Sequence, residues 1–175
     1  MTRVLVAYGS RRGSTAEIAG WIGDTLRGKG LEAEVADAGS VRDVTAYDAV
    51  VLGGALYAGH WHKDARRFAR RHAAALSGRP VWLFSSGPLD RSADEAGIPP
   101  VPKVARASEA LRALGHRTFG GRLAGDAKGF ITARIAARTG GDYRDPDAVR
   151  AWARQIAEQV ATAQRTEGRP APRAT

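Results

Sequence analysis

The sequence contains no cysteine, and its single methionine is Met1. These absences exclude disulfides, thiolate catalysis, iron–sulfur clusters and cysteine-ligated zinc. No apolar run approaches the ~20 residues that span a bilayer, and the N-terminus lacks the apolar core of a signal peptide. We therefore expect a cytoplasmic protein, in which any redox chemistry is supplied by a bound organic cofactor.

Lysine is also scarce, because only four of the 27 basic residues are lysine and the others are arginine. The formal net charge is nevertheless +9, which is typical of proteins that meet anionic partners. So much arginine, alanine and glycine is equally typical of a GC-rich genome, so a functional basic face and a purely compositional one both stay open. We do not expect nucleic-acid binding, because the basic residues lack interleaved aromatic residues and no known binding module is present.

At 175 residues the chain is long enough for one domain with a substantial core. Short apolar or alternating segments predict five strands, at residues 3–8, 31–36, 49–52, 80–84 and 117–123. Helical spacing of apolar residues predicts helices at residues 18–26, 60–76, 104–114 and 145–162. This alternation predicts an α/β fold, with a five-stranded parallel sheet and helices on both of its faces.

The last predicted helix begins with Asp145 as a plausible N-cap and Pro146 at its first position. Its apolar stripe is expected to face the core and consists of Val149, Trp152, Ile156 and Val160. From Gln164 onward the sequence is polar and contains Pro and Gly. We therefore expect one domain over residues 1–163 and a disordered polar tail over residues 164–175.

The turn after the first predicted strand is the most informative segment. It consists of Ser10, Arg11, Arg12, Gly13, Ser14 and Thr15. In parallel α/β sheets, ligands bind beyond the carboxyl ends of the strands, where helix N-termini present free N–H groups. Hydroxyls and backbone amides suit a phosphate, and Gly13 permits the turn that directs those amides inward. A Ser/Thr-rich helix cap with no ligand is the alternative interpretation.

Three kinds of nucleotide-binding site are possible interpretations of this turn. A P-loop needs a lysine before its Ser or Thr, whereas Gly13 is followed directly by Ser14. A dinucleotide fingerprint needs Gly-x-Gly-x-x-Gly, whereas the glycines here are only Gly9 and Gly13. Asp37 resembles the ribose-binding acid of dinucleotide folds and keeps NAD(P) open as an alternative. A hydroxyl-rich loop with one glycine favours a terminal phosphomonoester, as in flavin mononucleotide (FMN).

Two further loops extend the pattern. Gly53-Gly54-Ala55-Leu56-Tyr57-Ala58-Gly59-His60-Trp61-His62 follows the third predicted strand, and Ser85-Ser86-Gly87-Pro88 follows the fourth. Together with residues 10–15 they resemble the three FMN loops of the flavodoxin-like family, whose sheet has the strand order 2-1-3-4-5. The closer resemblance is to the flavodoxin-like protoporphyrinogen oxidases that use quinone as acceptor. It covers about residues 1–160 and includes Gly140-Gly141 and Trp152-Ala153-Arg154-Gln155-Ile156-Ala157.

The resemblance implies that FMN is the cofactor. It assigns the phosphate to Ser10, Arg11, Arg12, Gly13, Ser14 and Thr15. It assigns one side of the isoalloxazine to Ala55, Leu56, Tyr57, Ala58 and Gly59, and the other side to Ser86, Gly87 and Pro88. Tyr57 or Trp61 could stack on the ring, and each is equally open to being ordinary packing. The third loop offers no aromatic residue, which would leave one flavin face open to a planar substrate.

The basic charge favours an enzyme over a low-potential electron carrier, since carrier flavodoxins are typically acidic. One positive charge ~8 Å from the flavin stabilises the anionic reduced flavin by roughly 2 kcal/mol at an effective dielectric constant of ~20. This corresponds to a rise in the one-electron midpoint potential on the order of 90 mV. We therefore expect an FMN-dependent oxidoreductase acting on a quinone, a porphyrinogen-like or another aromatic substrate. The alternatives are a flavodoxin-type electron-transfer protein that docks on an acidic redox partner, and an accessory flavoprotein in a biosynthetic pathway.

His60 and His62 are the candidate catalytic residues, because imidazole titrates near neutrality and could donate protons or hold an anionic substrate. Packing at the start of a helix is the alternative for both. We expect no metal site, because these histidines and Asp64 have no further ligand cluster beside them. The Arg66-Arg67 and Arg70-Arg71 pairs indicate a solvated helix face or a docking patch for an acidic partner or anionic lipid. In the related oxidases the segment after the fifth strand is basic and strongly apolar, but residues 128–139 are less apolar here, so peripheral membrane contact is only weakly supported.

Overall fold

The computed structural model describes residues 1–11, 13–87, 98–123 and 141–167 of the chain. Its main sheet has the order β2-β1-β3-β5-β6, and each neighbouring pair in this order is parallel. The strands are β1 (Arg3–Gly9), β2 (Glu32–Asp37), β3 (Ala49–Tyr57), β5 (Val81–Ser86) and β6 (Gly115–Phe119). This arrangement confirms the predicted α/β fold, with five parallel strands in the expected spatial order.

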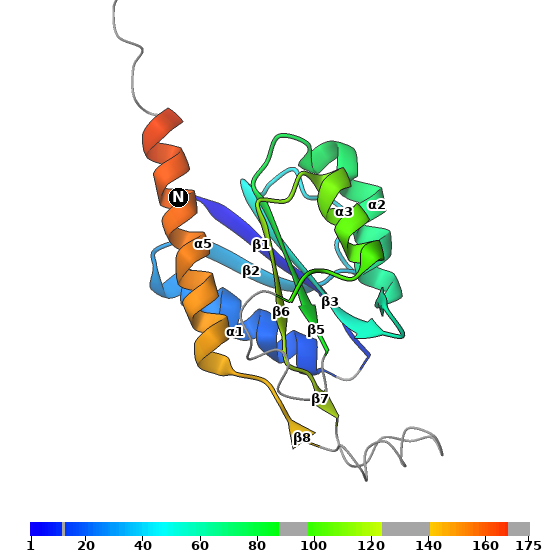
Figure 1. Ribbon diagram of the computed structural model, residues 1–175. Helices are drawn as coiled ribbons and strands as arrows, with labels where there is room; N and C mark the ends of the chain where they lie inside the picture. The colour runs from blue at the N-terminus through cyan, green and yellow to red at the C-terminus, as the bar shows by residue number, and fades with distance from the viewer. Residues whose placement is uncertain (12, 88–97, 124–140, 168–175) are drawn as a thin grey trace, which may run out of the picture.

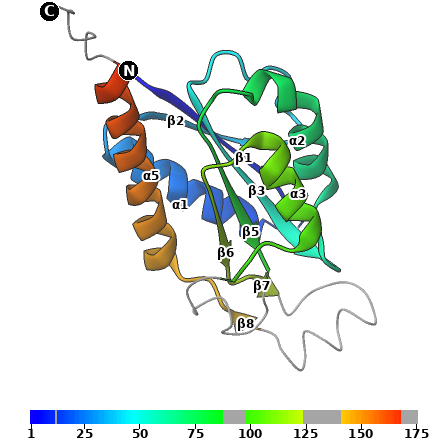
Figure 2. The ribbon, with the colours of Figure 1, turned by 45° about the horizontal axis from the view of Figure 1, so that its top comes forward.

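Helices cover both faces of the sheet. One face carries α1 (Ser14–Gly28) and α5 (Pro146–Glu167), and the other carries α2 (Lys63–Leu76) and α3 (Pro102–Leu111) (Figures 1 and 2). Side chains alternate along each strand, so Val4 and Val6 join the core under α1 and α5, whereas Leu5 joins the core under α2 and α3. The sheet is therefore buried on both faces, as expected of parallel strands.

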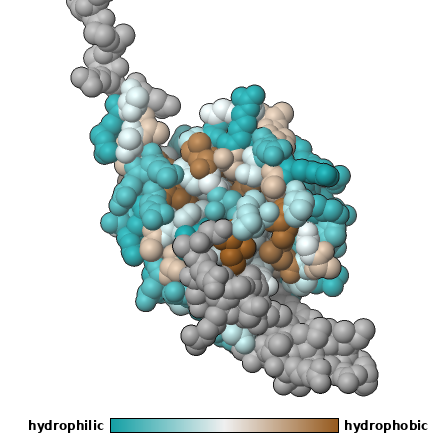
Figure 3. All heavy atoms as spheres, viewed as in Figure 1, coloured by the Kyte–Doolittle hydropathy of each residue, from teal (hydrophilic) through white to brown (hydrophobic). Residues whose placement is uncertain are grey.

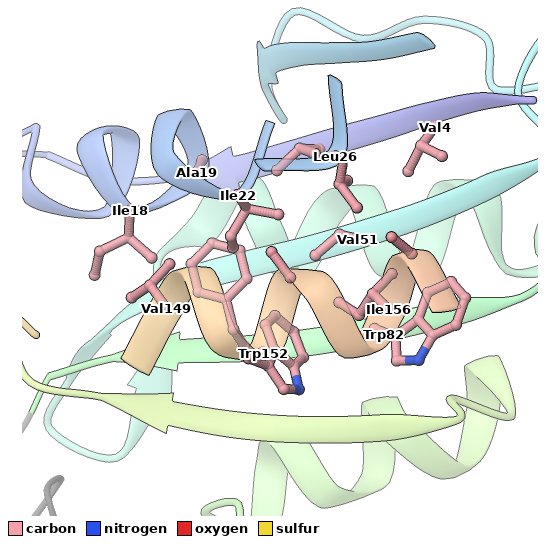
Figure 4. Close-up of a cluster of buried hydrophobic side chains, with 14 of the residues drawn as sticks. Val4, Ile18, Ala19, Ile22, Leu26, Val51, Trp82, Val149, Trp152 and Ile156 are labelled. Atoms are coloured by element: carbon pink, nitrogen blue, oxygen red, sulfur yellow. The ribbon is translucent and has the colours of Figure 1, made fainter. Parts of the chain in front are cut away.

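The core under α5 contains the predicted apolar stripe. Val149, Trp152 and Ile156 are buried there in one cluster with Ile18 and Ile22 of α1 (Figure 4), and the Trp152 ring contacts Phe84 and Phe119 edge-on. The predicted cap is also confirmed, since Oδ1 of Asp145 accepts hydrogen bonds from the N–H groups of Asp147 (2.9 Å) and Ala148 (3.0 Å). The helix is thus fixed at its start by a carboxylate and along its length by burial.

The end of α5 differs from the prediction. The helix continues to Glu167, so residues 164–167 are helical rather than part of a tail. The N-terminus lies beside this last part of α5 (Figure 1), and the side-chain amide of Gln164 donates to the hydroxyl of Thr2. The helix is therefore extended by a contact between Gln164 and Thr2, the residue before β1. A local sequence pattern cannot reveal a contact between residues so far apart in the chain. The expected tail at residues 168–175 lies outside the described residues.

Other boundaries were also predicted wrongly, and β3 continues to Tyr57 instead of ending at residue 52. The helix predicted at 60–76 begins at Lys63, because His60–Trp61 forms the short strand β4, antiparallel to β3. The helix predicted at 104–114 is α3, which begins at Pro102 and ends at Leu111 before the left-handed Arg112 (φ 50°). The strand predicted at 117–123 divides into β6 and β7 (Arg122–Leu123), and β7 pairs with β8 (Gly141–Asp142). Gly120 lies at this break, where a Cβ would lie 1.8 Å from the carbonyl oxygen of Tyr143.

The surface is largely hydrophilic on the side shown in Figure 3. Apolar residues gather in the middle of this side, between α5 on the left and α3 on the right, where the edge strand β6 lies. Within the described ranges, no helix is both long and apolar enough to cross a membrane.

Candidate functional site

The three loops singled out in the sequence meet at one edge of the sheet. They follow β1, β3 and β5, which are neighbours, so their carboxyl ends lie side by side. In register, Gly9 of β1 pairs with Gly54 of β3, and Ala55 of β3 pairs with Ser86 of β5. This edge is the position at which open α/β sheets bind ligands.

The first loop leads directly into the N-terminus of α1. Gly13 adopts the left-handed conformation (φ 80°), and its carbonyl oxygen accepts the N–H of Glu17 at 3.0 Å. This glycine lets the chain reverse into the helix, whose first-turn N–H groups have no partners within the helix itself. Arg11 is exposed beside them, and Arg12 lies outside the described residues.

Two hydroxyls at the start of α1 are buried and lack partners. The side chain of Thr15 is fully buried, and its Oγ1 has no hydrogen-bond partner in the described part of the chain. The same holds for Oγ of Ser14. A buried hydroxyl without a partner costs about 1–3 kcal/mol. Two such donors beside a positive helix end form a cradle that fits a phosphate.

The second loop is a tight hairpin. The strand β3 continues to Tyr57, and β4 returns with Leu56 opposite Trp61 and Tyr57 opposite His60. The two residues between these strands, Ala58 and Gly59, both have positive φ, 47° and 74°. Positive φ at both central positions defines a type I′ turn, whose twist matches that of the paired strands.

Trp61 fastens this hairpin to the sheet. Its ring lies over Gly54, where a Cβ would come within 2.6 Å of Cγ of the indole, and the residue is only 3% exposed. Its Nε1–H donates to Oγ of Ser85 at 2.9 Å. Trp61 is therefore a packing residue. Tyr57 is 40% exposed at the end of the hairpin and is the aromatic side chain available to a ligand.

A buried polar chain continues beyond Trp61. Oγ of Ser85 accepts from the indole and forms a hydrogen bond with Nε2 of His116 at 2.9 Å. Burial lowers the pKa of His116 to about 4, which leaves the imidazole neutral and able to accept. Sequence reasoning missed His116, because Ser85 lies 24 residues from Trp61 and 31 from His116, and no local pattern links them.

The third loop lies against the second. The N–H of Gly87 donates to the carbonyl of Phe119 at 3.0 Å, and a Cβ on Gly87 would lie 3.0 Å from Cβ of Leu56. Ser86 is buried at the end of β5. The second and third loops therefore touch through Leu56 and Gly87. Pro88 lies outside the described residues.

The two candidate catalytic histidines both have structural contacts. Nε2 of His60 contacts the ammonium of Lys103, which can only donate, so Nδ1–H of His60 donates to the carbonyl of Ala58 at 2.8 Å. His62 is buried and caps α2, with Nδ1 3.4 Å from the backbone nitrogen of Asp64. These contacts favour the packing interpretation over proton transfer. In the described ranges, no three His, Asp or Glu side chains come together as metal ligands.

A hollow of about 530 Å³ lies beside the hairpin. Its lining combines Arg11 of the first loop, Tyr57 and His60 of the hairpin, and Lys63 and Arg66 of α2. The volume falls within the range of small-molecule sites. Three cationic side chains around an aromatic ring suit an anionic or electron-poor planar ligand.

Comparison with known proteins agrees with this geometry. The family model described as flavodoxin domain matches residues 5–137. The chain belongs to the flavodoxin domain family. Protoporphyrinogen IX dehydrogenase (quinone) of Escherichia coli strain K12 is 31% identical over 85 residues, which cover 47% of this chain and 47% of that protein. The match therefore spans about half the length of this curated relative.

Solved flavodoxin-like structures share the fold. A flavodoxin from the domain Archaea superposes with a TM-score of 0.62 at 15% identity, over 91% of this chain and 99% of that one. Rubredoxin oxygen:oxidoreductase from Desulfovibrio gigas gives a TM-score of 0.64 at 11% identity, over 93% of this chain and 37% of that one. At such low identity, these likenesses concern the fold alone.

Family membership identifies FMN as the cofactor, and the first loop fits it. The hydroxyls of Ser14 and Thr15, which lack a partner within the described ranges, are donors that the terminal phosphate of FMN would satisfy. The NAD(P) alternative loses its main support, because Oδ1 of Asp37 accepts the N–H of Gly39 at 2.7 Å and so shapes the turn after β2. The protein is accordingly a flavoprotein of the oxidoreductase or electron-transfer type.

Proposed function

We propose that this flavodoxin-type protein, loaded with FMN, exchanges electrons directly with a quinone, a porphyrinogen-like or another aromatic substrate. The observation that carries the proposal is the pair of buried hydroxyls of Ser14 and Thr15 at the start of α1, which have no hydrogen-bond partner among the described residues. They supply a phosphate anchor at the sheet edge where Tyr57 and the hollow beside it are exposed. The similarity to a quinone-dependent protoporphyrinogen dehydrogenase suggests the substrate class.

The chain's own residues would divide the work between binding and orientation. Ser14, Thr15 and the first-turn amides of α1 would hold the phosphate, while FMN, when bound, supplies the electron-accepting ring. Tyr57 would contact the flavin or the substrate through its exposed ring. The Trp61–Ser85 hydrogen bond would keep the hairpin in place beneath Tyr57. His60 and His62 would support the hairpin and α2.

Charge around the hollow favours an enzyme over a low-potential carrier. Arg11, Lys63 and Arg66 line the hollow, so positive charge lies close to the proposed flavin edge. Each such charge at ~8 Å is worth roughly 2 kcal/mol at an effective dielectric constant of ~20. This stabilises the anionic reduced flavin and raises its midpoint potential, which suits electron acceptance from an organic substrate.

Rapid mixing of the FMN-loaded protein tests this proposal. The reduced protein is mixed without oxygen with a water-soluble naphthoquinone, and the oxidised protein with a dicarboxylate porphyrinogen, while flavin absorbance is followed. We expect at least one of these reactions to be faster than the same reaction of free FMN by about tenfold or more. Tyr57→Ala should slow it, and Tyr57→Phe, which keeps the ring, should not. Rates no faster than those of free FMN with both reagents would contradict direct substrate chemistry.

A second candidate function is electron transfer to a protein partner. The cationic side of α2, which carries Lys63, Arg66, Arg67 and Arg70, favours it, because an acidic surface would be attracted there. A protein that fails with both small molecules but exchanges electrons rapidly with an acidic redox protein would belong to this class.

A further inference from the structure

A groove runs between α2 and α3 on the face of the sheet opposite α1 and α5. Its volume is about 710 Å³. The floor is built mainly from small side chains, namely Ala69 and Ala73 of α2 and Ala107 and Ala110 of α3. Alanines allow another chain to approach the two helices closely, as in helix-in-groove recognition.

Cations stand on both walls of this groove. Lys63, Arg66, Arg67 and Arg70 line it from α2, and Lys103 and Arg106 line it from α3. The α2 residues are spaced three and four apart and therefore share one side of the helix. Among the residues that the structure describes, only Arg67 of these six has a carboxylate within reach, Oδ1 of Asp64 at 4.0 Å.

Some arginines on the helices of the other face are paired. On α1, Arg27 is paired with Asp24 at 2.7 Å, and on α5, Arg150 is paired with Asp147 at 3.3 Å. On α2, by contrast, Arg66 and Arg70 are like charges four residues apart, an arrangement that destabilises a helix. An arginine-rich composition accounts for the number of arginines but not for the gathering of six cations around one groove.

The groove adjoins the hollow beside the hairpin. Trp61, Lys63 and Arg66 line both the groove and the hollow beside the hairpin, so the two spaces adjoin. Lys103 at the start of α3 contacts His60 of the hairpin. The positive N-terminal ends of α2 and α3 both lie at this end, which adds to the positive potential there.

We propose that the α2–α3 groove is the docking site of an acidic protein that exchanges electrons with the flavin. The redox role of this partner rests on the proposed function, whereas the docking rests on the groove itself. The cations face one another across a concave, alanine-lined floor, which suits an inserted acidic segment carrying small apolar side chains. An anionic membrane is flat and would instead meet cations on an outward-facing surface.

Reduction of the flavin requires an electron donor, and the proposal names an acidic [2Fe–2S] ferredoxin, which carries one electron, as the class of that donor. Each reduced ferredoxin gives up one electron and becomes oxidised. Two such transfers, with two protons from water, convert the oxidised flavin to its dihydro form. Docking in a groove that adjoins the hollow would bring the partner's centre to the flavin edge.

Binding of a plant-type ferredoxin tests the proposal by titration calorimetry at low ionic strength, with apoprotein and FMN-loaded protein measured separately. The double variant Arg70→Glu/Arg106→Glu reverses one cation on each wall. Arg42→Glu/Arg154→Glu is the matched control, because it makes the same change in net charge at exposed arginines outside the groove. We expect the groove variant to weaken binding about tenfold or more and the control to weaken it less than about threefold.

A third variant tests whether the partner enters the groove or only binds to the charged surface around it. Ala73→Leu/Ala107→Leu fills the floor without changing the charge, and we expect it to weaken binding by about fivefold or more. Equal losses in the groove and control variants, an unchanged affinity after filling, or no binding of ferredoxin would each overturn the proposal. So would groove-dependent binding of phosphatidylglycerol vesicles without ferredoxin binding. Because binding of ferredoxin to the apoprotein is also measured, the docking proposal can be tested separately from the proposed reaction of the FMN-loaded protein.

Discussion

Replacing Thr15 by valine should change FMN affinity and apoprotein stability in opposite directions. The side chain is fully buried, and its Oγ1 has no partner in the described part of the chain. Valine keeps the shape and removes only the hydroxyl. Without FMN, the variant therefore escapes the cost of burying an unpaired polar group, and its free energy of unfolding should rise by about 1–3 kcal/mol.

With FMN bound, the same hydroxyl has a phosphate to which it can donate. Losing a hydrogen bond to a charged group costs about 1.5–3 kcal/mol. At 1.4 kcal/mol for each factor of ten, the Kd for FMN should rise roughly 10- to 150-fold. A purely structural helix-cap residue would not combine a more stable apoprotein with a weaker FMN complex.

Two measurements are needed, urea unfolding of the apoprotein and FMN titration followed by quenching of flavin fluorescence. Thr25→Val is the control, because it makes the same change on the same helix. Oγ1 of Thr25 already donates to the carbonyl of Trp21 at 2.7 Å. It should leave FMN affinity unchanged and should not stabilise the apoprotein. An unchanged Kd in Thr15→Val, or a loss of apoprotein stability, would refute the assignment of this hydroxyl to the phosphate.

Three further predictions concern the framework of the site. The free energy of unfolding should fall as the pH drops from about 6.5 toward about 4, because burial lowers the pKa of His116 to about 4 and the unfolded chain binds the proton first. When urea unfolding at neutral pH is compared with unfolding at about pH 5, this loss should be smaller in His116→Gln. Gly53→Ala should cost about 1–3 kcal/mol in thermal unfolding, because a Cβ there would lie 1.9 Å from Cζ of Phe84, and a neutral result would contradict the close packing. Arg144→Met should lower the free energy of unfolding by more than about 1 kcal/mol, and Arg150→Met by less than about 0.5 kcal/mol. The reason is that the Arg144 side chain is 5% exposed with two carboxylate partners, whereas that of Arg150 is 46% exposed with one. Equal losses in urea unfolding would contradict this difference.

The sequence was sufficient wherever a signal was local. The apolar run before Gly9 and the hydroxyls after Gly13 predicted the strand, turn and helix around the proposed phosphate site. Asp145 and the stripe beginning at Val149 predicted how α5 starts and which side it buries. In parallel α/β sheets, strand order and the edge that binds ligands follow from such local signals together with the rules of chain connection.

Non-local contacts account for what the sequence did not reveal. The helical spacing of apolar residues that begins at His60 corresponds to a helix only from Lys63 onward. His60 and Trp61 pair with β3 instead, because Gly54 leaves room for the indole. The chain from Trp61 through Ser85 to His116 joins three separate elements. Its members look like unrelated loop and strand residues until the sheet brings them together.

The comparison of FMN with riboflavin in titrations of the purified apoprotein tests the central claim most directly, because the two ligands differ only in the terminal phosphate. Two hydroxyl donors to that phosphate, Ser14 and Thr15, predict one FMN bound per chain and an affinity at least about 100-fold higher than that for riboflavin. Equal affinity for the two ligands, or no uptake of FMN, would contradict the claim.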